Sequence, residues 1–383
     1  MNYFTFHRPD LAADLCNRLA GKGLVDASSG LFLSAPRRVG KSTFLKEDLI
    51  PEAIRRGWLP VYVDLWVNKD RDPALLIADT LKVQLQLHEG KLKKAVRSIG
   101  LSKVIVMGAL TFDLSRPGLP EDITITDVLE ELHNRTKQPI VLIIDEAQHA
   151  LSTPAGVTAM FALKSARDKL NSSDADRKLL LVFTGSNRDK LANLVLNRTQ
   201  PFFGSGITPF PLLDRNFTNA FTTWANASLA EGNKLEEEGV SHAFSLVGHR
   251  PEMLRDLIGQ VAISGEAGNL TSLIEKGAQD INSRLWDEFE SEFASLTSIQ
   301  KAVLQVLILK GAPWSPFAEE SMAAYRAITG QDTISTATVQ TALDGLRDRS
   351  LVWRESRGAY TLEDQGFAEW FKHRRILQIS SEN

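Results

Sequence analysis

The sequence has little cysteine and no long apolar run, and each shortage excludes a class of protein. Cys16 is the single cysteine among 383 residues, so the chain cannot form an internal disulfide, and we expect a reducing compartment. No apolar stretch approaches the roughly 18 residues that a membrane span needs, and the N-terminus has no basic segment followed by an apolar core. The sequence therefore predicts a cytoplasmic protein without a membrane segment.

A strong excess of charge of one sign is also missing. The formal net charge is -3, so any nucleic-acid binding has to come from a local basic patch rather than from the field of the whole molecule. The hydrophobic fraction of 43% and the charged fraction of 24% are average for globular proteins and exclude a disordered or fibrous chain. A chain of 383 residues exceeds one ordinary core, so we expect two or three domains.

Extended apolar segments alternate with helical ones from residue 30 to about residue 210. This alternation is typical of a parallel sheet flanked by helices and predicts an α/β fold. The continuous apolar character of the segments indicates strands buried on both faces. Cys16 falls in an expected amphipathic helix at 10–19, where we predict a buried thiol. The expected strands are GLFLSA (30–35), LPVYVDLW (59–66), PIVLIIDE (139–146), KLLLVFTG (178–185) and ITPFPL (207–212).

The patterns divide the chain into three predicted domains. The first, 1–213, contains an irregular insertion at about 90–122 with a basic helix-like piece (KLKKAVRS) and a hairpin-like arm (KVIVMGALTFDL). The second, 214–290, has helical apolar spacing throughout and predicts a small helical lid. In the third, 298–377, patterns for three helices precede two short strands, LVWRE and AYTLE, which predicts a winged helix-turn-helix.

A phosphate-binding pattern follows the first expected strand. Residues 35–43 read APRRVGKST and match GxxxxGK(S/T), with alanine in place of the first glycine. Such a loop turns its backbone N–H groups toward a phosphate, its lysine reaches the β- and γ-phosphates, and its serine holds Mg²⁺. A Gly-Lys turn without function is the alternative, but the strand before the pattern and the helix after it favour the phosphate site. The predicted nucleotide-binding residues are Ala35, Pro36, Arg37, Arg38, Val39, Gly40, Lys41, Ser42 and Thr43.

An acidic pair ends the third expected strand, about 100 residues further on. Asp145 and Glu146 follow the apolar run PIVLII directly, and carboxylates at the end of a buried strand are costly unless they are used. We predict that Asp145 orders Mg²⁺ and that Glu146 acts as the general base toward the attacking water. The alternative is that the pair only caps the next helix.

Polar residues also end the fourth expected strand. Ser186, Asn187 and Arg188 follow LLLVFTG, beside the acidic pair in a parallel sheet. Asn187 is our preferred candidate for contacting the γ-phosphate or the attacking water, and Ser186 is the next. A plain helix N-cap is the alternative for either residue.

The motifs APRRVGKST, LIIDEAQH, FTGSN and VGHRPEML together resemble the archaeal-type ATPases among the STAND and AAA+ P-loop proteins. The resemblance covers roughly residues 1–290, and FTFHRPDLAADL is similar to an element that precedes the first strand in that family. The winged helix of the family also fits 298–377. The resemblance implies binding of ATP with Mg²⁺, slow hydrolysis, and a nucleotide-dependent switch that commonly works through oligomers.

The resemblance also implies roles for arginines. Arg198 follows the helix after the fourth strand, where AAA+ proteins place a finger arginine that reaches the nucleotide of a neighbouring subunit. Arg188 competes for that role, and a surface arginine near a loop is the alternative. Arg250 resembles the second sensor, which lets the lid respond to the γ-phosphate; a role for His249 or a helix cap is the alternative. We interpret the side chains of Arg37 and Arg38 as solvated or interfacial.

Two partners remain open from the sequence. Relatives with a winged helix include replication initiators and transposition regulators that assemble on DNA, so the resemblance implies duplex DNA as a partner. Residues 298–383, however, carry 10 Lys and Arg against 10 Asp and Glu, and a phosphate-binding face is normally more basic. The alternative is a signalling or defence-type switch whose winged helix binds protein.

Overall fold

The structure is a computed structural model, and it forms two compact units. The sheet unit comprises His7–Ala35 and Lys41–Phe210, and the helical unit comprises Met1–Phe6, Pro36–Gly40 and Pro211–Asn383. The described residues are 4–22, 25–68, 70–88, 104–107, 110–113, 117–120, 122–172, 177–264, 269–311, 314–356 and 358–382.

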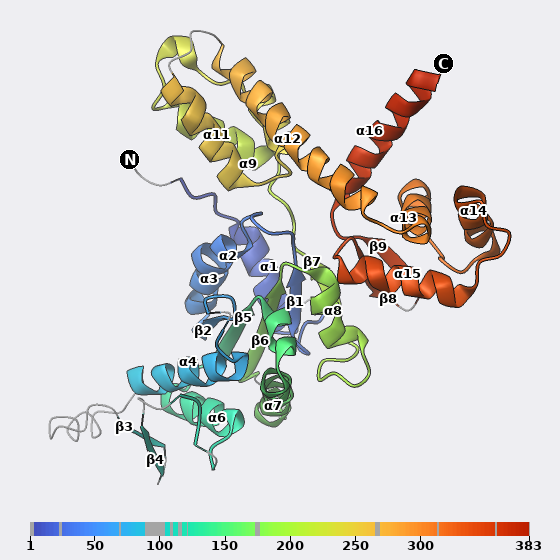
Figure 1. Ribbon diagram of the computed structural model, residues 1–383. Helices are drawn as coiled ribbons and strands as arrows, with labels where there is room; N and C mark the ends of the chain where they lie inside the picture. The colour runs from blue at the N-terminus through green and yellow to red at the C-terminus, as the bar shows by residue number, and fades with distance from the viewer. Residues whose placement is uncertain are drawn as a thin grey trace. The chain divides into compact units, whose positions relative to one another are not determined.

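The sheet unit is built on a parallel five-stranded sheet (Figure 1). The strands lie in the order β2-β5-β6-β1-β7, and every neighbouring pair is parallel. Strands β1, β5 and β6 are buried along their whole length, which accounts for their unbroken apolar sequences. The α/β fold class predicted from the sequence is confirmed. The strand bounds are β1 Leu31–Ser34, β2 Leu59–Asp64, β5 Ile140–Asp145, β6 Leu179–Gly185 and β7 Ile207–Pro209.

Helices flank this sheet and share one hydrophobic core with it. Helix α1 packs against α3, while α4, α6 and α7 pack on one another. Cys16 on α1 is buried as predicted, and burial raises the pKa of its thiol to about 12. The helix bounds are α1 Pro9–Leu19, α2 Lys41–Phe44, α3 Ile50–Arg55, α4 Pro73–Leu87, α6 Ile125–Thr136, α7 Pro154–Leu170 and α8 Arg188–Leu196.

The helix expected after the phosphate-binding pattern is present but changes its winding. Between α2 and α3 it widens into a π-helical turn, Leu45–Leu49. Pro51, in the first turn of α3, has no backbone N–H and cannot donate to the preceding turn of an α-helix. A π-helical turn is a common way to accommodate such a missing hydrogen bond.

The helical unit begins with four helices around a separate hydrophobic core: α9 Arg215–Asn226, α10 Glu237–Leu246, α11 Pro251–Ser264 and α12 Leu270–Ala294. Pro251 opens α11, where a proline is tolerated because its missing N–H would have no partner in the helix. Phe4 packs edge-on against Phe221 of α9, with ring centroids 5.2 Å apart. Phe4 and Phe6 near the N-terminus thus pack against the hydrophobic core that α9–α12 form.

The rest of the helical unit has the elements predicted for a winged helix-turn-helix. Three helices precede the antiparallel pair β8 and β9, and α16 follows. A capping box formed by Thr297 and Gln300 starts α13, and Tyr325 of α14 is fully buried. Helix α16 was not predicted. The bounds are α13 Ser298–Lys310, α14 Glu319–Thr329, α15 Thr336–Asp348, β8 Val352–Ser356, β9 Ala359–Leu362 and α16 Gln365–Glu382.

Several expected boundaries differ from those observed. Strand β7 ends at Pro209 rather than at residue 212, since Pro209 and Pro211 lack the N–H that a strand interior uses. Helix α12 continues past residue 290, the expected end of the lid. The hairpin-like arm is observed as β3 (Val104–Met107) paired with β4 (Leu110–Asp113), whereas the basic piece at 91–98 lies outside the described residues. Among the described helices, none is both long and apolar enough to cross a membrane.

Candidate nucleotide-binding site

The loop between β1 and α2 contains two residues with a left-handed backbone, of which one is glycine. Gly40 has a φ of +86° and Arg38 a φ of +67°, which is the left-handed region that favours glycine. Ala35, which replaces the first glycine of the pattern, is not among the residues with a positive φ. Its buried N–H donates to the carbonyl of Gly185 at 3.2 Å. The alanine is therefore compatible with the backbone at this position.

Lys41 and Ser42 at the start of α2 meet the acidic pair at the end of β5. The Lys41 side chain is 6% exposed, and its Nζ lies 3.2 Å from Glu146 Oε1. The Ser42 hydroxyl donates to Asp145 Oδ2 at 2.8 Å. Two motifs separated by more than 100 residues in the sequence thus form one cluster of side chains within the sheet unit.

Asp145 is almost fully buried, with 1% of its surface exposed, and accepts hydrogen bonds on both oxygens. Besides Ser42, the hydroxyl of Tyr62 on β2 donates to Oδ2 at 2.7 Å. Oδ1 accepts from the hydroxyl of Thr184 on β6 and from the backbone N–H of Glu146 at 3.1 Å. The carboxylate is therefore fixed by groups from α2, β2 and β6.

Glu146 has a φ of +56°, which is uncommon for a residue with a side chain and costs on the order of 1 kcal/mol. Its Oε2 accepts from the Ser186 hydroxyl at 2.6 Å and from Gln148 Nε2 at 2.5 Å, while Oε1 faces Lys41. Backbone strain of this kind is concentrated at functional sites. The surrounding donors hold the carboxylate beside the lysine.

Both carboxylates are held in the charged form. Burial raises the pKa of Asp145, but the hydrogen bond from Thr184, the charge of Lys41 and the hydroxyls of Tyr62 and Ser42 outweigh it, so that its pKa lies below the ordinary value. For Glu146, burial also raises the pKa, and the charge of Lys41 with the hydrogen bonds around it lowers the pKa below the ordinary value. A charged Asp145 suits a metal site, and a charged Glu146 suits a proton acceptor.

The chemistry of these donors fits Mg²⁺ and a nucleotide phosphate. Mg²⁺ prefers oxygen ligands and usually takes one or two protein groups, leaving the rest to phosphates and water. Ser42 and Asp145 supply such oxygens, 2.8 Å apart. Among the described residues, no group of three or more His, Cys, Asp or Glu is arranged to hold a metal ion. The buried Lys41 ammonium is a cation of the kind that pairs with phosphate oxygens.

The structure separates the roles of the two polar residues that follow β6. Asn187 is the N-cap of α8, where its side-chain oxygen accepts from the Lys190 N–H at 2.8 Å. Ser186, the second candidate from the sequence, is the one that contacts Glu146. Three further residues of the cluster were not predicted as site residues: Tyr62, Thr184 and Gln148. Gly185 leaves room for Gln148, since a Cβ atom at position 185 would lie 2.6 Å from Gln148 Oε1.

The candidate arginines lie in different parts of the chain. Arg198 is exposed in the loop after α8, and Arg188 is half-buried in the first turn of α8; both belong to the sheet unit. Arg250 precedes α11 in the helical unit, where its Nη1 lies 3.9 Å from Met253 Sδ. Exposed side chains at Arg37 and Arg38 agree with their interpretation as solvated residues.

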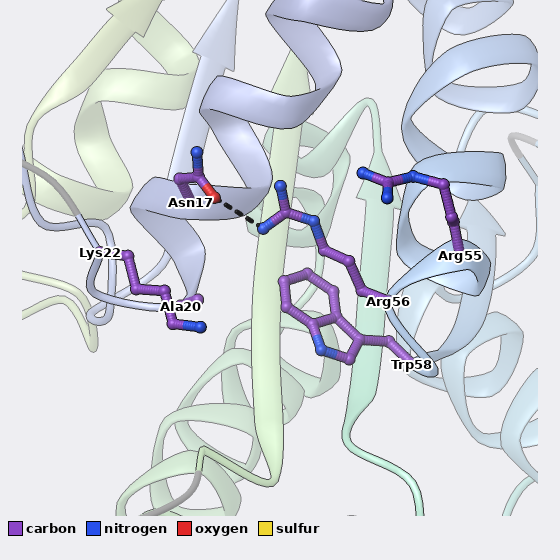
Figure 2. Close-up of a pocket in the computed structure, with 6 residues that line it drawn as sticks. All are labelled: Asn17, Ala20, Lys22, Arg55, Arg56 and Trp58. Carbon is purple, nitrogen blue, oxygen red and sulfur yellow. Dashed lines mark hydrogen bonds between the residues drawn. The ribbon is translucent and has the colours of Figure 1, made fainter.

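A pocket of about 390 Å³ opens elsewhere in the sheet unit, lined by Asn17, Ala20, Lys22, Arg55, Arg56 and Trp58 (Figure 2). Trp58 directly precedes β2, so the pocket lies at the amino ends of the parallel strands, whereas Asp145 lies at their carboxyl ends. Arg55 donates twice to Glu52 at 2.7 Å, and Arg56 donates to Glu52 and to two oxygens of α1. These arginines are already paired within the chain, so the pocket does not make a strong anion site.

Comparisons with known proteins identify the fold. No protein-family model matches the sequence, and no curated protein matches it. The Walker-type ATPase of Pyrococcus abyssi superposes with a TM-score of 0.54 at 17% identity over 96% of both chains. The ORC2 protein of Aeropyrum pernix in its ADP form gives a TM-score of 0.55 at 15% identity, over 99% of this chain and 96% of that one. Its ADPNP–ADP complexes give 0.50 at 16% identity, over 100% and 97%. The chain therefore shares its fold with the Walker-type ATPase and the ORC2 protein.

Proposed function

We propose that this protein binds Mg-ATP and hydrolyses it slowly, using the nucleotide state as a conformational switch. The observation that carries the proposal is the cluster of Lys41 and Ser42 with Asp145 and Glu146 at the carboxyl edge of the sheet. The nucleotide complexes of the ORC2 protein, which has the same fold, support it. The residues Pro36–Gly40 and Thr43 complete the proposed phosphate-binding segment, and Gly40 supplies the left-handed backbone that such a loop uses.

Each residue of the cluster has a proposed role. Lys41 leaves Glu146 and pairs with the β- and γ-phosphates, while Ser42 and Asp145 hold the metal. A Mg²⁺ ion held by Ser42 and Asp145 would offset the negative charge of the phosphate groups. Glu146 accepts a proton from the attacking water, and Ser186 keeps its carboxylate in place. The polar side chain of Asn187 stays a candidate for contact with the γ-phosphate.

Two arginines extend the proposal to a homo-oligomer. Arg198 is exposed in a loop and would act as a finger on the nucleotide of a neighbouring copy, a contribution of roughly 10³- to 10⁵-fold where such fingers operate. Arg250, at the start of α11, would couple the lid helices α9–α12 to the γ-phosphate. Both roles rest on the resemblance to AAA+ proteins. With these two roles, assembly of the homo-oligomer would depend on ATP.

The test of the ATPase proposal is the dependence of hydrolysis on the metal. We expect the purified chain to release phosphate from ATP in Mg²⁺, with a turnover that is slow for an enzyme, and to lose this activity in excess EDTA because Ser42 and Asp145 then have no ion to hold. Activity should return when Mg²⁺ is added back. Phosphate release that continues unchanged in EDTA would contradict a site built on these two residues.

The winged helix extends the proposal to duplex DNA as a partner. Three helices and a hairpin are the elements with which such domains place a helix in the major groove. Helix α15 would enter the groove, and Arg354 of β8 would contact phosphate; Arg357, the other predicted wing arginine, lies outside the described residues. ATP binding would then regulate assembly on DNA.

We expect duplex DNA to bind the full chain with an affinity that falls at least tenfold between about 50 mM and about 200 mM salt, because phosphate contacts release counterions. Fluorescence anisotropy of a labelled duplex measures it. Arg354→Ala should weaken binding. Arg326→Ala is the matched control, since Arg326 on α14 pairs with Glu319 away from β8. Salt-independent binding, or none, would remove DNA as a partner.

A protein partner is the second candidate, and the charge of α15 favours it. Arg347, the basic residue of this helix, lies 3.3 Å from the Asp344 carboxylate. The exposed face at the start of the helix consists of threonines and an alanine. The segment 298–383 is neutral overall, with 10 basic and 10 acidic residues. A face with so little unpaired positive charge suits a protein surface better than a polyanion.

A further inference from the structure

The Asp145 carboxylate already has as many hydrogen-bond donors as it has acceptor positions. A carboxylate offers about four lone-pair sites. Here Ser42 and Tyr62 donate to Oδ2, and Thr184 and the Glu146 N–H donate to Oδ1. A further donor, such as a water carried by a metal ion, can bond to this carboxylate only by replacing one of the four.

Three of the four donors cannot readily give up their hydrogen bond to Asp145. The Glu146 N–H belongs to the backbone and is fixed by the chain itself. Thr184 is 0% exposed, so a hydroxyl that left Asp145 would lose its partner without reaching water. Ser42 can keep its O–H on Asp145 while its own oxygen faces a metal, because a hydroxyl has lone pairs in addition to its proton.

Tyr62 is different in its position. It lies on β2, the edge strand of the sheet, and is only partly buried, whereas Thr184 is fully buried. One side of its ring is covered by the flexible side chain of Lys46, with Nζ 5.1 Å from the ring centroid. Lys46 is exposed on the π-helical turn and can move with the ring.

We propose that Tyr62 is a positioning residue that competes with the metal. Its hydroxyl donates to Asp145 Oδ2 and is displaced when a metal-bound water donates to the same oxygen. Tyr62 therefore raises the Mg²⁺ concentration at which the site is half-saturated. The inference rests on the proposed Mg-ATP site and adds a regulatory element to it. Loss of the hydroxyl should therefore tighten metal binding, whereas loss of Thr184, a donor that only fixes the carboxylate, should weaken it.

The experiment titrates Mn²⁺, a spectroscopic substitute for Mg²⁺, into the full chain with saturating ADP and counts free Mn²⁺ by electron paramagnetic resonance. ADP allows no turnover, so hydrolysis does not contribute to the measurement. Tyr62→Phe is expected to lower the half-saturating Mn²⁺ concentration by about tenfold, the scale of one hydrogen bond to a charged group. Thr184→Val is expected to raise it, and Tyr360→Phe, a buried tyrosine of β9, is the matched control with no change.

The outcomes separate this inference from the proposed function. If the wild-type chain binds ADP and Mn²⁺ but Tyr62→Phe leaves the half-saturating concentration unchanged or raises it, Tyr62 is not a competing donor. The same follows if Tyr62→Phe and Thr184→Val shift it in the same direction. If a melting curve shows that the wild-type chain is folded but it binds neither ADP nor Mn²⁺, the nucleotide site and this inference are both wrong.

Discussion

Replacement of Lys41 by alanine is expected to abolish ATP hydrolysis and to weaken ATP binding by roughly tenfold to a hundredfold, the scale of one or two charge-assisted hydrogen bonds. Lys41 is buried at the start of α2, and its ammonium is held at the carboxyl edge of the sheet by Glu146. Alanine removes the cation while leaving the backbone of the loop intact. Isothermal titration with a non-hydrolysable ATP analogue and a phosphate-release assay measure the two effects.

The control is Lys190→Ala, which removes an exposed lysine from α8 in the same unit and should leave binding and turnover unchanged. Melting curves are needed because Lys41→Ala leaves the Glu146 carboxylate half-buried without its cation, a change that can destabilise the fold. Lys41→Met, which keeps most of the apolar stem, serves as a second variant. Normal ATP affinity in both folded variants would contradict the role of Lys41.

The chain positions of the central residues could be predicted because each motif follows an apolar strand. The run PIVLII ends at Asp145, and GLFLSA leads into the loop before Lys41, so a parallel sheet had to bring both to its carboxyl edge. The complete strand order was not predictable from these motifs, although the polar residues after the fourth expected strand were placed beside the acidic pair. The structure places β6 between β1 and β5, and this is why Thr184 reaches Asp145 and Ser186 reaches Glu146.

Other contacts depend on side-chain directions that no sequence pattern expresses. Tyr62 appears in the sequence as an ordinary strand residue, and only the pairing of β2 with β5 directs its hydroxyl to Asp145. Asn187 and Ser186 are adjacent polar residues after β6, and the sequence favoured Asn187. The structure makes Asn187 the cap of α8, because the first N–H groups of a helix need an acceptor, and leaves Ser186 to face Glu146.

Replacement of Glu146 by glutamine is expected to slow hydrolysis by about 10²- to 10⁴-fold, the usual contribution of a general base, while ATP still binds. Glutamine has nearly the shape of glutamate and can keep a hydrogen bond with Ser186, but its amide cannot accept a proton from water. It also removes the charge that holds Lys41, so the ammonium is freer to pair with phosphates. Single-turnover hydrolysis and equilibrium binding of ATP, measured on the same preparation, separate the two effects.

Glu130→Gln is the matched control, because it makes the same chemical change in a carboxylate that pairs with Lys169 on the surface. It should hydrolyse ATP at the wild-type rate. Because Glu146→Gln slows the hydrolysis of bound ATP, any assembly that requires ATP should persist longer in this variant than in wild type. Hydrolysis at the full rate by Glu146→Gln would show that the carboxylate is not the base. The pair with Lys41 and the bond from Ser186 would then serve only to hold the lysine and the end of β5 in place.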